Sequence, residues 1–184
     1  WITHYLKLDG FINLVGESQL VQRRYSEIGN PTIQFNESIL DEVSSGYIKR
    51  DQQGKQNSYN YNYWCSPVSI QGGLNNAPYS VASILKDGTD SANPKTITFG
   101  DGAYFADGPL TSPIKISNRW IWSYNSQTPD SNTDLDNYNQ WYFIKSNGVL
   151  KTAEGFTMKG SGGTAPINNT QNYVFQGKPN NGTI

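Results

Sequence analysis

Segment 6–22 reads LKLDGFINLVGESQLVQ, and its alternating pattern decides the fold class. Aliphatic residues hold even positions, whereas odd positions are mostly polar; the even set is Leu6, Leu8, Ile12, Leu14 and Leu20. Because successive side chains of a strand point to opposite faces, this set is predicted to line one buried face. A straight strand of this length would span roughly 50 Å, so we expect bends at Asp9-Gly10 and at Gly16.

Short strands that turn at small residues are typical of a β-solenoid. The composition also favours β structure, since 13% of the residues are aromatic, only 16% are charged and 12 are tyrosines. Further strands are predicted at 32–35, 39–40, 46–50, 59–64, 96–99, 114–124, 141–144, 155–160 and 172–177. Segment 80–85 fits either a strand or a helical turn, and no amphipathic helix is expected.

The polar segment 51–57 is predicted to be a turn and a domain boundary. We therefore expect an all-β chain. Residues 1–50 would form short solenoid-like strands, and residues 51–184 an antiparallel β-sandwich similar to a jelly roll. The sandwich would cap the solenoid, whose open end otherwise exposes strand edges. The sequence starts without methionine and in mid-pattern, which indicates a piece of a longer, extracellular protein.

Charge and residue usage exclude several classes of function. With a net charge of −1 and no basic stripe, the chain is not expected to bind nucleic acid or anionic membranes. No apolar run approaches the ~20 residues of a membrane span. Cys65, the one cysteine, lies in the apolar run YWCSPV and is predicted to be buried and unpaired. The one histidine, His4, lies near the N-terminal end, so we expect neither a hydrolytic triad nor a zinc site and predict no enzyme.

Four motifs occur in order along the chain: LDGFINLVGESQL at 8–20, YWCSPV at 63–68, EGFTMKG at 154–160 and YVFQGKPNNG at 173–182. Together they resemble a module of large Bacteroidota cell-surface proteins that the type IX secretion system exports. The resemblance covers nearly the whole chain and implies a long adhesin with a separate C-terminal sorting domain. It implies a cell-surface location and supplies no catalytic residues. The partners it implies are neighbouring modules of the same chain, surface polysaccharide or other cell-surface proteins.

One loop has the oxygen pattern of a calcium site. Asp130, Asn132, Asp134 and Asp136 put oxygen side chains at alternate positions, which lets a loop wrap around Ca²⁺. Leu135 and Trp141 replace the glycine and glutamate of an EF-hand, so a solvated polar loop is the alternative. Calcium is the one candidate cofactor.

Aromatic side chains are candidates for stacking on sugar rings. Tyr59, Tyr61 and Trp122 are the main candidates, with Tyr63, Trp120 and Trp141 beside them. The alternative places the tryptophans in the core and the tyrosines in cross-strand ladders.

Two further features involve aspartates. The triplet Asp90-Ser91-Ala92 resembles the O-glycosylation acceptor of Bacteroidota, which would place a glycan on Ser91. The Asp-Gly pairs, such as those at Asp87 and Asp101, are predicted to form turns rather than a metal site.

These patterns predict a non-catalytic structural or adhesive module of an extracellular, multi-module surface protein or filament. The alternative is a carbohydrate-binding module of a secreted polysaccharide-degrading protein. The sequence leaves both open.

Overall fold

The computed structural model describes residues 2–26, 35–102, 112–125, 140–162 and 166–182. Within these ranges the fold is nearly all β, and the helical elements with described bounds are α1 (Val81–Ile84) and the 3₁₀ turn η1 (Asn118–Trp120). The all-β class predicted from the sequence is therefore confirmed.

Most strands are short, as the frequent turn residues predict. Their bounds are β1 Ile2–Thr3, β2 Tyr5–Leu6, β3 Phe11–Leu14, β4 Val21–Gln22, β5 Ile39–Leu40, β6 Tyr47–Lys55, β7 Tyr61–Cys65, β8 Val68–Ser69, β9 Leu85–Asp87, β10 Lys95–Thr96, β11 Thr98–Gly100, β12 Lys115–Ser117, β13 Trp122–Tyr124, β14 Trp141–Phe143, β15 Gly155–Lys159 and β16 Thr170–Pro179.

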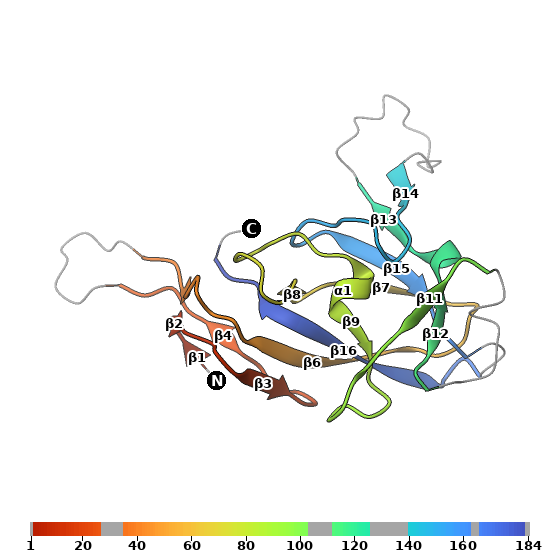
Figure 1. The fold of residues 1–184 in the computed structure, drawn as a ribbon, viewed down its shortest axis with the longest axis horizontal. Helices are drawn as coiled ribbons and strands as arrows, with labels where there is room; N and C mark the ends of the chain where they lie inside the picture. Colours follow the sequence, from red (N-terminus) through yellow and green to blue (C-terminus); the bar gives the residue numbers. More distant parts are fainter. Residues whose placement is uncertain (1, 27–34, 103–111, 126–139, 163–165, 183–184) are drawn as a thin grey trace.

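Two sheets form the body of the molecule (Figure 1). The first has six strands in the order β10-β9-β16-β6-β3, with β8 paired to the end of β16. The second is antiparallel and has four strands in the order β14-β13-β15-β7. Trp64 of β7 joins the sheets, since its ring centroid lies 4.9 Å from that of Tyr173 and 5.9 Å from that of Phe175 in β16. The arrangement is that of a β-sandwich.

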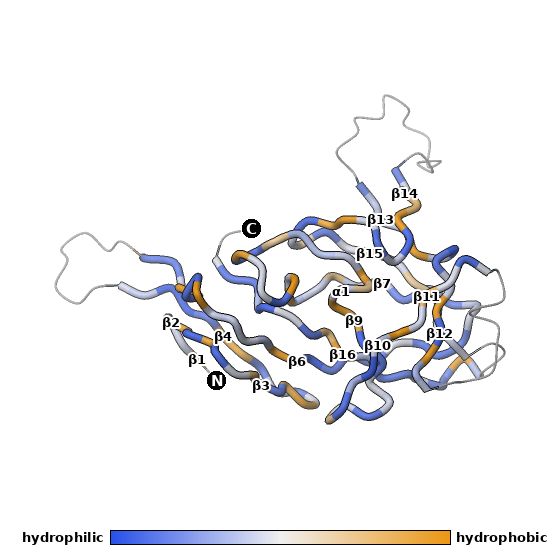
Figure 2. The backbone as a smooth tube through the Cα atoms, viewed as in Figure 1, coloured by the Kyte–Doolittle hydropathy of each residue, from blue (hydrophilic) through white to orange (hydrophobic). Residues whose placement is uncertain are grey.

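The core fills the space between the sheets. Met158 and Phe156 of β15 are buried in it, together with Val81, Ile84 and Leu85 around α1. Figure 2 shows these hydrophobic positions of α1 and β9 at the centre of the molecule. The core fixes β15, and with it the opposite, outward face of the four-stranded sheet.

The N-terminal segment follows its predicted alternation. Leu8 and Leu14 are buried, and Leu6, Ile12 and Leu20 pack partly buried against the same core. The chain bends at Gly16, whose φ is +60°, and Ser18 N donates a hydrogen bond of 3.1 Å to Val15 O. A residue without a Cβ is favoured at this φ. The predicted buried face and this predicted bend are both confirmed.

The first strands pair in parallel with strands that follow them. β1 pairs with β4, β2 with β5 and β3 with β6, all in parallel. Residues 39–50 therefore run alongside residues 5–14 in the same direction. Parallel pairs need a connection that returns the chain to its starting end, and residues 15–38 provide it.

The turn predicted at 51–57 is wrong, because β6 continues to Lys55. β16 pairs with β6 over Lys55 to Ile48, so every residue of the polar stretch 51–55 has a partner. Gln53 and Asn172 lie opposite each other, and Gln53 Nε2 donates a 2.8 Å hydrogen bond to Asn172 Oδ1. The expected boundary after residue 50 thus falls inside a strand, and β3 and β9 belong to one sheet.

Two other predicted strands are interrupted. The strand predicted at 114–124 is wrong as one element, because η1 separates β12 from β13. Ser117 Oγ accepts a 3.2 Å hydrogen bond from Arg119 N, and Ile121 becomes buried. At 80–85 the helical turn α1 is followed directly by β9. The strand predicted at 32–35 lies outside the described residues except for Phe35, which is not in a strand.

Candidate functional site

The outward face of the four-stranded sheet carries a row of aromatic side chains. Pairing aligns Phe143 with Trp122, Trp122 with Thr157 and Thr157 with Tyr63. Side chains directly opposite one another lie on the same face of a sheet. Tyr61, Tyr124, Trp141 and Lys159 are two positions from members of this row and share its face.

The row contains an open groove of about 520 Å³. Thr157 forms its floor and is only 4% exposed, because the larger side chains on either side cover it. The aromatic side chains that line the groove are Tyr61 and Tyr63 of β7, Trp122 of β13 and Trp141 of β14. The walls are therefore apolar rings, and the floor has a hydroxyl group.

A second hollow of about 380 Å³ continues from this groove along Tyr63 and Trp141. Tyr124 and Gly155 line it as well. Gly155 has no side chain, so the sheet surface stays low between β7 and β13 at this level. Together the two hollows extend the apolar surface across several strands.

Contacts among the rings hold the walls in place. The ring centroids of Trp122 and Phe143 lie 5.1 Å apart, as do those of Tyr124 and Trp141. Trp122 Nε1 donates a 3.2 Å hydrogen bond to Arg119 O, and Tyr124 is hydrogen-bonded through its hydroxyl to Gln140. A ligand would meet rings that are already ordered, which lowers the entropy cost of binding.

A positive charge lies at the Tyr61 end of the groove. Lys159 Nζ is 3.8 Å from the ring centroid of Trp120 and 5.2 Å from that of Tyr61. Both rings attract the ammonium through cation–π interactions. In the part of the chain that the structure describes, the ion pairs do not involve Lys159. The ammonium group therefore lies against two aromatic rings beside the groove.

Two tyrosines, Tyr61 and Tyr63, lie side by side in the groove. Burial, and then the neighbouring Tyr63, raise the pKa of the Tyr61 hydroxyl above its ordinary value. Tyr63 is 68% exposed and its ring lies 6.4 Å from that of Tyr61. The raised pKa keeps the Tyr61 hydroxyl protonated at physiological pH, so that it can donate a hydrogen bond to a polar ligand.

The sequence predicted only part of this set. Of the three main candidates, Tyr61 and Trp122 line the groove, whereas Tyr59 is 70% exposed in the turn before β7 and is not among the lining residues. The sequence did not indicate Thr157 and Lys159 as residues of the site, although alternation within the predicted strand 155–160 places them on one face. Only the pairing of β15 with β7 and β13 shows that this face is the aromatic one.

The prediction that Cys65 is buried is wrong. The thiol is exposed, and it is unpaired as expected. Alternation along β7 explains the exposure, because Trp64 points into the core and Cys65 must then point outward with Tyr63. Partial burial by its neighbours still raises the pKa of the Cys65 thiol.

Asp90 lies in a turn. Asp90 Oδ1 accepts a 3.1 Å hydrogen bond from Ala92 N. Ser91 lies half-buried within this turn, between β9 and β10. The nearby Asp87 is buried and accepts hydrogen bonds from Thr89 N at 2.9 Å and Ile114 N at 3.0 Å, so it secures the chain locally.

The candidate calcium ligands lie outside the described residues; they are Asp130, Asn132, Asp134 and Asp136. Among the residues that are described, no three His, Cys, Asp or Glu side chains come together as a metal site. The described helices are also too short to cross a membrane. Comparison with protein-family models, curated proteins and solved structures found no match to this chain.

Proposed function

We propose that this chain is a non-catalytic module that binds a polysaccharide, within an extracellular, multi-module surface protein. The observation that carries the proposal is the groove with four aromatic walls and a threonine floor on an antiparallel sheet. The C–H faces of sugar rings are apolar and stack on aromatic rings, whereas their hydroxyls need polar partners. The groove offers both.

The shape of the site favours a chain of sugars over a single sugar. The groove is open, and a second hollow continues it past Tyr63 and Trp141. A closed pocket would bury most of a small ligand, whereas an open groove lets a polymer enter and leave at both ends.

The extracellular and multi-module parts rest on different observations. The four ordered motifs resemble exported Bacteroidota surface modules, and that resemblance implies export by the type IX route to the cell surface. The parallel pairs β1–β4, β2–β5 and β3–β6 support a solenoid-like N-terminal part, because successive turns of a solenoid pair in parallel. Neighbouring modules of the same chain are the natural partners of such a structure, whether in an adhesin or in a surface filament.

The same groove would serve a carbohydrate-binding module of a secreted polysaccharide-degrading protein. The neighbouring domains of the full-length protein distinguish this function from that of an adhesive surface module. A hydrolase domain in the full-length protein would favour this second function, and repeated modules with a sorting domain would favour adhesion.

The test is binding to a panel of immobilised polysaccharides, followed by titration of the best ligand. Trp122→Ala removes one wall and is expected to weaken binding by tenfold or more, since each 1.4 kcal/mol is a factor of ten. Tyr59→Ala is the matched control, because Tyr59 is an exposed aromatic residue outside the groove. Trp122→Phe keeps an aromatic ring and is expected to retain most of the affinity.

Two results would overturn the proposal. One is the absence of saturable binding to any polysaccharide in the panel. The other is an equal loss of affinity in Trp122→Ala and Tyr59→Ala, which would show that the groove is not the site. The thermal midpoint of each variant establishes that it is folded.

A further inference from the structure

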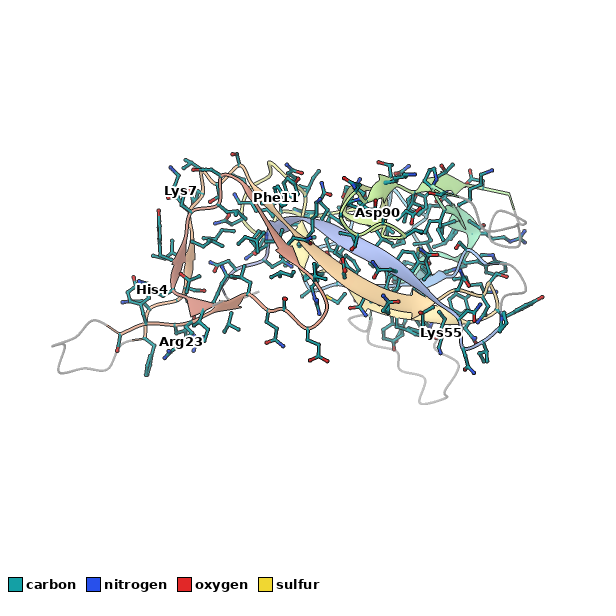
Figure 3. All side chains as sticks on the ribbon, turned by 90° about the horizontal axis from the view of Figure 1, so that it is seen from below. His4, Lys7, Phe11, Arg23, Lys55 and Asp90 are labelled. Carbon is teal, nitrogen blue, oxygen red and sulfur yellow. The ribbon has the colours of Figure 1, made fainter. Side chains whose placement is uncertain are left out.

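Among the strands that the structure describes, one edge of the six-stranded sheet is open. β3 is the last strand in the order, and its partner β6 lies on one side only. Figure 3 shows β3, with Phe11 labelled, at the border of the sheet beside β6. Gly10 O accepts a 3.1 Å hydrogen bond from Tyr47 N, so the backbone groups of even residues point to β6. Those of Phe11 and Asn13 therefore point to the open edge.

The two paired segments are alike in sequence. The parallel register places Leu6 beside Leu40 and Ile12 beside Ile48. Phe11 lies beside Tyr47, and their rings stack with centroids 5.6 Å apart and an angle of 13°. One position earlier, Gly10 corresponds to Gly46. Residues 5–14 thus form a layer of the same kind as residues 39–50.

The two glycines have different surroundings. A Cβ on Gly46 would lie 2.1 Å from Gly10 O and 2.7 Å from Leu8 O, so a side chain is excluded there by the adjacent layer. A Cβ on Gly10 would meet no described atom within 4 Å, and the φ of Gly10 is not in the left-handed region. Gly46 is required by the layer beside it, whereas Gly10 faces open space where the next layer would lie.

We propose that the free edge of β2 and β3 binds a parallel strand from a neighbouring module of the same protein. The bound strand pairs with the free edge of β3 in parallel, with the same register that β3 has on β6. Its backbone carbonyls pass over Gly10, and an aromatic side chain stacks on Phe11, which is 59% exposed in this chain. The main-chain groups of Phe11 and Asn13 supply its hydrogen bonds. The inference rests on the multi-module part of the proposed function and is independent of the groove.

The test uses a peptide with the sequence of residues 5–14, YLKLDGFINL, and the intact isotope-labelled chain. We expect saturable NMR shifts of the Phe11 and Asn13 amides, and no such shifts with a scrambled peptide. Gly10→Val is expected to weaken binding at least tenfold because its side chain occupies the path of the strand. Its thermal midpoint should stay unchanged, since the space around Gly10 is open.

Three outcomes would overturn the inference. The first is the absence of saturable shifts in β3, and the second is equal affinity in Gly10→Val. The third is a concentration-dependent dimer, detected by sedimentation without peptide, whose formation shifts the Phe11 and Asn13 amide signals. The strand bound at the edge of β3 would then come from a second copy of this chain. Polysaccharide binding by Gly10→Val, measured in parallel, should equal that of the unmodified chain. Loss of peptide binding alone therefore leaves the groove proposal intact.

Discussion

Gly46→Ala is expected to destabilise the N-terminal layers strongly. The added Cβ would lie 2.1 Å from Gly10 O and 2.7 Å from Leu8 O, and both are backbone atoms that cannot rotate away. Relief of these contacts requires the segments around β3 and β6 to separate by about 1 Å or more, since close-packed atoms sit roughly 3.5–4 Å apart. The same two carbonyls accept hydrogen bonds from Tyr47 N at 3.1 Å and Gly46 N at 2.7 Å.

The size of the effect follows from these contacts. Loss of two backbone hydrogen bonds costs about 1 kcal/mol each. Overpacking of the interface adds about 1–3 kcal/mol. We therefore expect the free energy of unfolding to fall by about 3–5 kcal/mol in Gly46→Ala.

Urea denaturation followed by tryptophan fluorescence measures this change, with the slope m as a check on the transition. Gly10→Ala is the matched control at the corresponding position of the neighbouring layer. Its Cβ meets no described atom within 4 Å. Its stability should stay the same or rise by up to about 1 kcal/mol, because alanine has less freedom in the unfolded chain. A loss below about 1 kcal/mol in Gly46→Ala, or equal losses in both variants, would refute the reasoning.

Three further predictions concern other parts of the chain. A thiol reagent should label Cys65 in the native protein, more slowly near pH 8 than a free cysteine because its pKa is raised; absence of labelling would contradict its exposure. The hydrogen bond from the Asn118 amide, and then the charge of Lys145, lower the pKa of Asp101. The ionised carboxylate therefore stabilises the folded chain above the unfolded pKa of about 4, and this contribution is lost as the pH falls through the folded pKa. Asp101→Asn should therefore lose less thermal stability than the unmodified chain between about pH 4 and 2. If the acidic loop binds calcium, chelator should lower the thermal midpoint and Asp134→Ala should abolish that response; at a hundredfold excess over Kd the ion contributes about 2.7 kcal/mol.

Local alternation was enough to predict the parts of the fold that depend on one strand at a time. The aliphatic side chains at the even positions, from Leu6 to Leu20, pack against the core as their pattern indicates. The strands at β7, β15 and β16 were also recognised from their own residues. The same rule could have corrected the error on Cys65, because inward Trp64 requires its neighbour to point outward.

The remaining errors come from pairing between distant segments. The stretch 51–55 is polar enough for a turn, but β16 offers it a partner at every position and makes it a strand. Conversely, the stretch 114–124 alternates like a single strand but is interrupted by η1, which begins where Ser117 Oγ accepts a hydrogen bond from Arg119 N. The groove likewise depends on register, since Tyr63, Thr157 and Trp122 come together only through three paired strands. Sequence could name the aromatic residues but not the surface that they share.

The most direct test of the central claim is an NMR map of the chain with an oligosaccharide of the best polysaccharide in the panel. We expect saturable shifts at Tyr61, Tyr63, Thr157 and Trp122, around the groove, and none at Tyr59. Saturable shifts confined to residues outside the four-stranded sheet would contradict the claim that this aromatic groove binds the glycan.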